Sequence, residues 1–361
     1  MRVLFITQDG KQLPTARVRG YAFAEIVKKS GMEAELLSYR DHLKASRHGV
    51  QLCEMGWGEK ILLNLRALPK LFSAKVDLFY IQKINYHILA PVMISKFRRI
   101  PYLIDFDDFE YLEEDQDAWQ NRVIRYVLRR AAGVVASSHA LADWCSMHNS
   151  NTFLIPTGVD AAMFSPKMEI CHRSQTLVWL GVVIDRLIFD TILDIVGMFE
   201  QIATRDQTVN LCLVLKGRYL SEIKTQVHQS PAAERIQVHE NVAHQDVPEL
   251  LSRATIGFLT YHMNNRWVIS KSPTKLFEYM AAGLVPICTR GTEADHVIRH
   301  GINGFLIESL KEGQKIVEFL LRNPSRMTEI SRSARDTILQ GYCWENLGVG
   351  LQRVIRSVMD P

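Results

Sequence analysis

A short segment, residues 271–287, carries the residue types that phosphate and sugar recognition require. It runs Lys-Ser-Pro-Thr-Lys-Leu-Phe-Glu-Tyr-Met-Ala-Ala-Gly-Leu-Val-Pro-Ile. The pattern predicts a polar loop and then a helix over 274–282, whose N-terminus offers unpaired N–H groups and a partial positive charge to a phosphate. Lys275 adds a full positive charge there. One turn later, the Glu278 carboxylate is able to accept hydrogen bonds from a sugar diol.

The alternative interpretation of this segment is an ordinary capped helix of an α/β domain. Ser272 is a suitable N-cap residue, and Pro273 is of a type tolerated at the start of a helix. Gly283 stands where helices commonly end with a left-handed residue. The two interpretations are separated only by the other motifs of the chain.

Three carboxylates follow a predicted buried strand in the segment 101–108: Asp105, Asp107 and Asp108. In open α/β sheets, ligands gather outside such strand ends. Asp105 and Asp107 match the Asp-x-Asp pattern with which other enzymes hold a divalent metal under a nucleotide. Contacts to a substrate's hydroxyl groups and a solvated or capping role are the alternatives that the residues leave open.

The elements that would position these residues alternate between strand and helix in both halves of the chain. Strands are predicted over 3–7 and 33–38, with a helix over 16–28 between them, which indicates a parallel α/β sheet. This opening lacks Gly-x-Gly-x-x-Gly, so it carries no dinucleotide fingerprint. The same rhythm restarts at residue 177, after a turn rich in Pro and Gly at 156–160.

The overall composition is that of a globular protein of 361 residues, for which two domains are the natural expectation. A net charge of +4 is too small to indicate a nucleic-acid-binding protein. The six cysteines form no metal-ligand spacing and indicate reduced thiols. No apolar run is long enough to span a membrane, and the first residues do not resemble a signal peptide. We therefore expect a cytoplasmic protein.

Basic residues are concentrated between His42 and Arg99, a stretch that contains ten Lys or Arg and only three Asp or Glu. Within that region, residues 61–72 are both apolar and basic, and Trp57 lies just upstream. One interpretation is a helix packed on the sheet with a solvated basic rim. The other is that residues 42–99 contact an anionic membrane on the cytoplasmic face, or an anionic acceptor.

Four stretches in order resemble the GT-B glycosyltransferases, specifically the retaining glycosyltransferase family 4 (glycosyl transferases group 1). They are Ala-Gly-Val-Val-Ala-Ser-Ser at 132–138, Ile-Pro-Thr-Gly-Val-Asp at 155–160 with Phe164 following, Glu-Tyr-Met-Ala-Ala-Gly-Leu-Val-Pro at 278–286, and Gly-Ile-Asn-Gly-Phe-Leu at 301–306. The resemblance covers nearly the whole chain. It implies an α/β fold of GT-B architecture, in which two Rossmann-like domains face each other across a cleft.

The resemblance also implies a division of labour between the domains. Residues 1–168 would form the N-terminal acceptor-binding domain and residues 169–341 the C-terminal nucleotide-sugar-binding domain. Residues 342–361 would form a C-terminal helix that packs back on the N-terminal domain and couples the two halves for closure.

For the donor, the resemblance implies that Glu278 holds the ribose hydroxyls and that the loop of Ser272, Pro273 and Thr274 offers N–H groups to the diphosphate. The family places an Arg and a Lys after the first strand of this domain. Here Val182 replaces the Arg, and Arg186 is the candidate for the Lys role, with Lys216 as the weaker one. Lys275 is a further donor-binding candidate.

On the acceptor side, residues 15–19 occupy the loop-to-helix turn that faces the cleft in such proteins. Arg17 is the preferred contact to the donor diphosphate or an anionic acceptor, whereas Arg19 is either a weaker contact or a surface cation. Many relatives carry a His near the end of the fourth strand. Asp105, Asp107 and Asp108 stand in that region here, as weak candidates for acceptor or sugar contacts.

The largest departure from the family is Lys271, which stands where the family's first motif glutamate contacts the donor sugar. Three interpretations remain: a donor with an acidic or unusual sugar, a shifted register in this Ser-Pro-Thr-Lys variety, or a weakened site. The shifted register is favoured, since Lys275 and Glu278 stand in suitable places.

We therefore expect a metal-independent, retaining glycosyltransferase. It would transfer a sugar from a nucleotide-diphosphate sugar, its co-substrate in place of a cofactor, in the synthesis of a cell-surface polysaccharide, glycolipid or related glycoconjugate. The acceptor would be a glycan, a lipid-linked molecule or a small molecule, and not nucleic acid. The alternatives are a metal-dependent transferase using Asp105 and Asp107, a non-catalytic sugar-nucleotide-binding or partner subunit, and an epimerase of the same fold. The base, the sugar, the acceptor and the oligomeric state cannot be inferred from the sequence.

Overall fold

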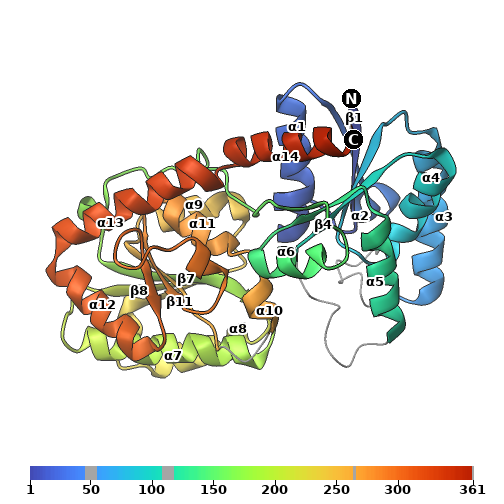
Figure 1. The fold of residues 1–361 in the computed structure, drawn as a ribbon. Helices are drawn as coiled ribbons and strands as arrows, with labels where there is room; N and C mark the ends of the chain where they lie inside the picture. The colour runs from blue at the N-terminus through green and yellow to red at the C-terminus, as the bar shows by residue number, and fades with distance from the viewer. Residues whose placement is uncertain (45–54, 108–117, 263–265, 360–361) are drawn as a thin grey trace. The chain divides into compact units, whose positions relative to one another are not determined.

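The computed structural model describes residues 1–44, 55–107, 118–262 and 266–359, and the chain divides into two compact units (Figure 1). The first unit comprises residues 1–157, 270–272 and 344–361, and the second comprises residues 158–269 and 273–343. The chain thus leaves the first unit within the Pro-Thr-Gly turn, before the boundary expected at residue 168. Each unit is built on one parallel β-sheet.

The first unit has a sheet whose strands are ordered β2-β1-β3-β4-β5-β6. Its strands are β1 (Arg2–Thr7), β2 (Glu33–Ser38), β3 (Leu78–Gln82), β4 (Tyr102–Phe106), β5 (Gly133–Ala136) and β6 (Thr152–Leu154). Its described helices are α1 (Ala22–Lys29), α2 (Tyr39–Leu43), α3 (Trp57–Ser73), α4 (Leu89–Arg98), α5 (Ala118–Arg130), α6 (His139–Ser146) and α14 (Trp344–Met359). The strand interiors are almost entirely buried, because helices cover both faces of a parallel sheet.

The C-terminal helix α14 packs on α1 within this unit (Figure 1). The contact is close because Gly348 has no side chain: a Cβ there would come within 2.1 Å of Ile26 on α1. The predicted helix over 16–28 is not a uniform α-helix. It begins as a π-helical turn, η1 (Ala16–Tyr21), and continues as α1. Such turns are rare and often accompany functional positions.

The second unit has the strand order β12-β11-β10-β7-β8-β9, which changes direction between β7 and β10. Its strands are β7 (Thr176–Val183), β8 (Asn210–Gly217), β9 (Ile236–Glu240), β10 (Ile256–Leu259), β11 (Val285–Thr289) and β12 (Phe305–Ile307). Its described helices are α7 (Arg186–Ala203), α8 (Leu220–Gln229), α9 (Val247–Leu251), α10 (Arg266–Ser270), α11 (Thr274–Ala281), α12 (Leu310–Arg322) and α13 (Pro324–Thr337). In parallel sheets of this type, ligands bind at the carboxyl ends of the strands near such a change of direction.

Helices cover both faces of the sheet of the second unit (Figure 1). Helices α7, α8 and α12 pack on one face and α9 and α11 on the other, and α13 contributes to both apolar clusters. Helix α11 ends as expected, since Gly283 takes the left-handed conformation with φ +72°. Within the described parts of the chain, no helix is long and apolar enough to cross a membrane.

One buried histidine makes the stability of the first unit depend on pH. His87 is fully buried after β3, and its Nε2 lies 2.9 Å from the Gln82 carbonyl oxygen. Burial, with a smaller contribution from Lys83, lowers the pKa of His87 to about 4. A histidine with a depressed pKa in the folded state must bind a proton on unfolding at acidic pH.

We therefore predict that stability is complete above pH 6.5 and falls as the pH decreases toward 4, by up to about 3 kcal/mol from this residue. The measurement is the free energy of unfolding in urea at pH 7 to 4, for the wild type and for His87→Gln. The variant should have a flatter profile in this range. Equal slopes for the two proteins would contradict the assignment, and His228→Gln, on the exposed face of α8, serves as control.

Candidate functional site

The predicted donor-binding helix is present as α11, and Glu278 on it is almost completely buried, with 6% of its surface exposed. Glu278 Oε1 lies 3.2 Å from His244 Nε2. The His244 ring packs edge-on against Phe164, with 5.6 Å between the ring centres. A buried carboxylate is costly unless it is hydrogen-bonded, and here one imidazole contact holds it in place. The remaining acceptor capacity of Glu278 is suited to vicinal hydroxyl groups.

The N-terminus of α11 differs from the prediction in its capping. Ser272 does not cap the helix: its hydroxyl accepts a hydrogen bond from the Thr157 N–H at 3.2 Å instead. Pro273 occupies the cap position and provides no side-chain hydrogen bond. The first-turn N–H groups, starting at Thr274, therefore lack the usual side-chain acceptor and suit an anion.

The lysines near this helix differ in exposure. Lys275 is partly buried; burial lowers its pKa, and the neighbouring Glu278 carboxylate opposes that shift. Lys271 is partly buried in the turn before the helix. Lys216 is exposed near the carboxyl end of β8 and makes no ion pair with a described residue. Val182 pairs with it in the sheet register and is 38% exposed, where the family has an arginine.

Arg186, the favoured counterpart of the family lysine, is already neutralised. Its guanidinium lies 3.1 Å from Glu222 and 3.6 Å from Asp190, and it stacks 4.0 Å above the Phe189 ring. An arginine held by two carboxylates is less available to a phosphate than an unpaired lysine. The geometry therefore favours Lys216 over Arg186 as the cation at this edge of the sheet.

In the first unit, Arg19, which was expected to be either a weak contact or a surface cation, is buried, with 1% of its surface exposed. Its Nε and Nη2 each lie 2.8 Å from Asp105 Oδ1, and its Nη1 donates to the Ile155 carbonyl oxygen at 2.9 Å. Tyr80 donates its hydroxyl hydrogen to the other oxygen of Asp105, at 2.9 Å. The expectation of a surface cation at Arg19 is therefore wrong, and the reason is its ion pair with a buried carboxylate.

Burial and the partner's charge shift the pKa of each residue of this ion pair in opposite directions. Burial raises the pKa of Asp105, and Arg19 opposes the shift. For Arg19, burial alone would lower the pKa, but the Asp105 charge raises it above its usual value. We describe the pair as ionised, because a guanidinium keeps its proton in proteins and Asp105 accepts hydrogen bonds from Arg19 and Tyr80.

The other candidates of the first unit are distributed around this ion pair. Asp105 lies inside β4 with no exposed surface, so it presents no open face to a metal or a sugar. Asp107 is buried after the strand, and its Oδ1 lies 3.8 Å from Lys83 Nζ. Arg17 is partly buried in η1, two residues before Arg19. Asp108 lies outside the described residues.

Breaking the buried ion pair should destabilise the first unit strongly. We predict that Asp105→Asn lowers the free energy of unfolding by about 3–5 kcal/mol, because Arg19 is left buried without a counter-charge. The double variant Arg19→Met/Asp105→Asn should lose less than this single variant does. Urea unfolding of both variants and the wild type measures the difference.

An exposed ion pair of the same unit provides the control. Arg2 and Glu33 lie 2.8 Å apart at the edge of the sheet, and Glu33→Gln should cost only about 0–1 kcal/mol. A cost for Asp105→Asn as small as that of Glu33→Gln would show that the buried pair is not needed for the fold.

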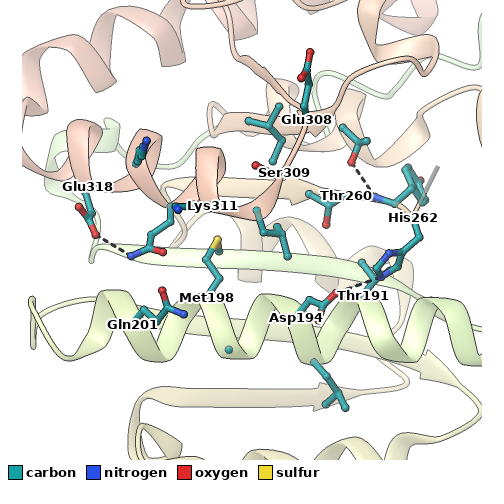
Figure 2. A pocket seen from close by; sticks show the side chains of 18 of the residues that line it. Thr191, Asp194, Met198, Gln201, Thr260, His262, Glu308, Ser309, Lys311 and Glu318 are labelled. Carbon is teal, nitrogen blue, oxygen red and sulfur yellow. Dashed lines mark hydrogen bonds and ion pairs between the residues drawn. The ribbon is translucent and has the colours of Figure 1, made fainter.

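A further pocket of the second unit lies away from these residues (Figure 2). It is a groove between α7 and α12, which we call the α7–α12 groove. Its lining includes Asp194, Gly197, Gln201, Thr260, His262 and Lys311. None of the predicted donor-binding residues lines it. A buried carboxylate and an open helix N-terminus occur together at Glu278 and its surroundings.

Sequence reasoning missed His244 and the α7–α12 groove. His244 was overlooked because a single histidine in a loop carries no motif; its position just after the carboxyl end of β9 was the available signal. The groove residues come from helices and strand ends far apart in the sequence. A regular polar stripe on the otherwise apolar α7 was the signal for them.

Comparison with known proteins agrees with this description. Residues 191–337 match the family model described as Glycosyl transferases group 1. No curated protein sequence matches the chain.

Solved structures resemble the chain over nearly its full length. HepE of Anabaena in complex with UDP-glucose has a TM-score of 0.73 and 15% identity, covering 99% of this chain and 100% of that one. A glycosyltransferase from Rickettsia africae has a TM-score of 0.75 and 13% identity, and sucrose-phosphate synthase from Thermosynechococcus elongatus 0.74 and 15%. Both comparisons cover 99% of this chain and 98% of the other.

These matches confirm the predicted fold class and the predicted resemblance to GT-B glycosyltransferases of group 1. The chain has the GT-B α/β fold of two parallel-sheet units, and most of its second unit matches the group 1 glycosyl transferases. At this level of identity, the structural likeness concerns the fold and does not identify a donor or an acceptor.

Proposed function

We propose that the protein is a glycosyltransferase that moves a sugar from a nucleoside-diphosphate donor to an acceptor hydroxyl with retention of configuration. The observation that carries the proposal is Glu278, a buried carboxylate held by His244 one turn inside an uncapped helix N-terminus. Both features lie in the segment that matches the group 1 model. UDP is the first nucleotide to test, because it is bound in the similar HepE structure.

In this proposal the donor lies along the carboxyl edge of the second sheet. Glu278 accepts hydrogen bonds from the two ribose hydroxyls, and His244 fixes the orientation of the carboxylate. The first-turn N–H groups from Thr274 onward bind the diphosphate, with Lys275 and Lys216 as nearby cations. Arg17, on η1 of the first unit, is the further cationic candidate for the donor diphosphate or an anionic acceptor.

The chemistry follows from where charge develops. The bond between the sugar's anomeric carbon and the diphosphate oxygen breaks, and a bond to the acceptor oxygen forms on the same face. The acceptor proton passes to the departing diphosphate. Negative charge grows on the diphosphate as it leaves, so N–H groups and ammonium groups placed there stabilise the transition state more than the ground state. This step requires no metal.

Lys271 bears on the choice of sugar. The family's first motif carboxylate contacts the sugar hydroxyls, and an ammonium at that position would favour a sugar that carries a carboxylate. The shifted-register interpretation assigns the conserved functions to Lys275 and Glu278 instead, and we retain it. A donor screen that compares UDP-glucose with UDP-glucuronate separates these two interpretations.

The first functional prediction concerns Glu278. We expect Glu278→Ala to weaken UDP binding about 10- to 100-fold, because hydrogen bonds to a buried charged group contribute about 1.5–3 kcal/mol. The measurement is calorimetric titration with UDP, followed by product analysis with a UDP-sugar. Glu234→Ala, which removes an exposed carboxylate of the same unit, should bind UDP like the wild type.

Unchanged UDP binding and transfer in Glu278→Ala would remove the central assignment. The same assays separate the alternatives. Free sugar without glycoside would indicate the epimerase-like reaction, and nucleotide binding without turnover would indicate a non-catalytic subunit. Activity lost on chelation and restored by manganese would support the metal-dependent transferase.

We further propose that the first unit contacts an anionic membrane through α3 and α4. Large apolar side chains form a stripe on the exposed face of each helix, at successive-turn spacing. These residues, which we call the α3–α4 patch, are Trp57, Ile61, Leu65, Phe72, Leu89, Met93 and Phe97. The two stripes meet where the rings of Phe72 and Phe97 lie 5.9 Å apart. Trp57 and Phe97 are 67% and 74% exposed, and contiguous apolar surface of this kind usually marks an interaction site.

The charges around the α3–α4 patch favour a bilayer over a protein partner. Exposed basic side chains flank it, and Glu59 is the one acidic residue on the two helices; the basic residues are Arg66, Lys70, Lys96 and Arg99. Apolar side chains on a basic surface are typical of proteins that bind anionic lipid headgroups. A lipid-linked acceptor would be consistent with this location.

Vesicle sedimentation tests the membrane proposal. We expect the wild type to bind phosphatidylglycerol-containing vesicles at low salt, and Leu65→Ser/Phe97→Ser to bind about 100-fold or more weakly, since each buried side chain contributes about 1.5–3 kcal/mol. Arg66→Gln/Lys70→Gln should weaken binding to anionic vesicles only. Leu339→Ser, an exposed apolar position in the second unit, should have no effect. No sedimentation of the wild type even at low salt would contradict the proposal and favour a soluble acceptor.

A further inference from the structure

The α7–α12 groove has the size and position of a ligand site. Its volume is about 1010 Å³, at the upper end of the roughly 300–1,000 Å³ of typical small-molecule pockets. Its walls come from α7 and α12, and its base includes residues at the carboxyl ends of β10, β11 and β12 (Figure 2). That edge of a parallel sheet is where ligands gather.

A residue in the base of this groove carries a buried hydroxyl without a partner. Thr260 follows β10, is 6% exposed, and its Oγ1 has no hydrogen-bond partner among the described residues. By contrast, the neighbouring Thr289 accepts a hydrogen bond from the Tyr261 N–H at 2.9 Å. Figure 2 shows Thr260 between the two helices, below Ser309. An unsatisfied buried hydroxyl destabilises a protein, so the base of the groove holds a polar group that no described residue satisfies.

A glycine in the wall of the groove has no packing explanation. Gly197 lies in the interior of α7, where glycine disfavours the helix relative to any ordinary residue except proline. A Cβ built at Gly197 would meet no atom within 4 Å. Close packing therefore does not require glycine at this position. What the missing side chain provides is room in the groove.

The polar lining favours a ligand with many hydroxyl groups over a strongly charged one. Three acidic and three basic side chains line the groove besides His262, so it has no excess of either charge. His262 Nε2 lies 3.3 Å from Asp194 Oδ2 near Thr260. Toward the other end, Glu318 is bound by Arg205 at 2.7 Å and by Gln314 at 3.1 Å. Such mixed donors and acceptors match sugar hydroxyls, which donate and accept at once.

We infer that the α7–α12 groove binds a neutral oligosaccharide at a site separate from the donor-binding residues around Glu278. The groove is long enough to be lined by successive turns of α7, from Thr191 to Arg205, which suits a chain of sugars better than a single ring. Such a site would hold a glycan on the second unit. The inference is drawn from the groove alone and does not depend on the proposed transfer reaction.

The test is direct binding of neutral tetrasaccharides of glucose, galactose, mannose and N-acetylglucosamine, each titrated by calorimetry or NMR at millimolar concentration. We expect at least one of them to bind the wild type. Gly197→Leu should reduce its affinity about tenfold or more by filling the groove, without lowering Tm, since leucine favours the helix.

Two further variants locate the bound sugar. Gly58→Leu is the matched control, because Gly58 is also helical and a Cβ there also meets no atom within 4 Å; it should bind like the wild type. Glu278→Ala should leave tetrasaccharide binding unchanged. The inference is overturned if no tetrasaccharide binds the wild type, or if binding survives Gly197→Leu unchanged. Loss of binding in Glu278→Ala with retention in Gly197→Leu would also overturn it, by placing the sugar at the donor site.

Discussion

The first unit depends on a charge that has no water around it. Arg19 is buried, so its guanidinium is stable only while Asp105 and the Ile155 carbonyl group receive its hydrogen bonds. Asp105 belongs to β4, and Tyr80 on β3 donates to the same carboxylate. The ion pair and its hydrogen bonds thereby connect η1, the central strands β3 and β4, and Ile155 after β6. Arg17 lies two residues earlier on the same turn η1.

In the second unit the situation is reversed. The buried carboxylate, Glu278, makes no direct ion pair with a described lysine or arginine. Glu278 has the His244 imidazole at 3.2 Å, and Lys275 lies one turn earlier on the same helix. A carboxylate with this little compensation is stabilised by any ligand that donates hydrogen bonds to it. The uncapped start of α11 is likewise incomplete without an acceptor. Both deficits lie on one short helix, and a nucleoside diphosphate supplies the diol and the anion that would complete them.

Regular elements were predictable from the sequence because their signals are local. The strand over 33–38 was predicted with the observed bounds, and Gly283 ends α11 in the expected conformation. Side-chain partners were not predictable in this way. Ser272 is of the right residue type for an N-cap. Its hydroxyl instead accepts a hydrogen bond from the N–H of Thr157, which is distant in the sequence. From the sequence, Arg19 looks like a surface cation, because its partner Asp105 lies far from it along the chain.

Stability that a sequence gives up without a packing reason is evidence about function, and two of the described surfaces are examples. On α3 and α4, large apolar side chains face solvent although the opposite faces of these helices already fill the core. On α7, a glycine weakens a helix while its missing side chain meets no neighbour. Neither choice improves the fold of the isolated chain, and both become favourable once something covers the surface. The two surfaces suit different partners, because the α3–α4 patch is apolar with a basic border and the α7–α12 groove is polar and balanced in charge. A bilayer suits the first and a glycan suits the second.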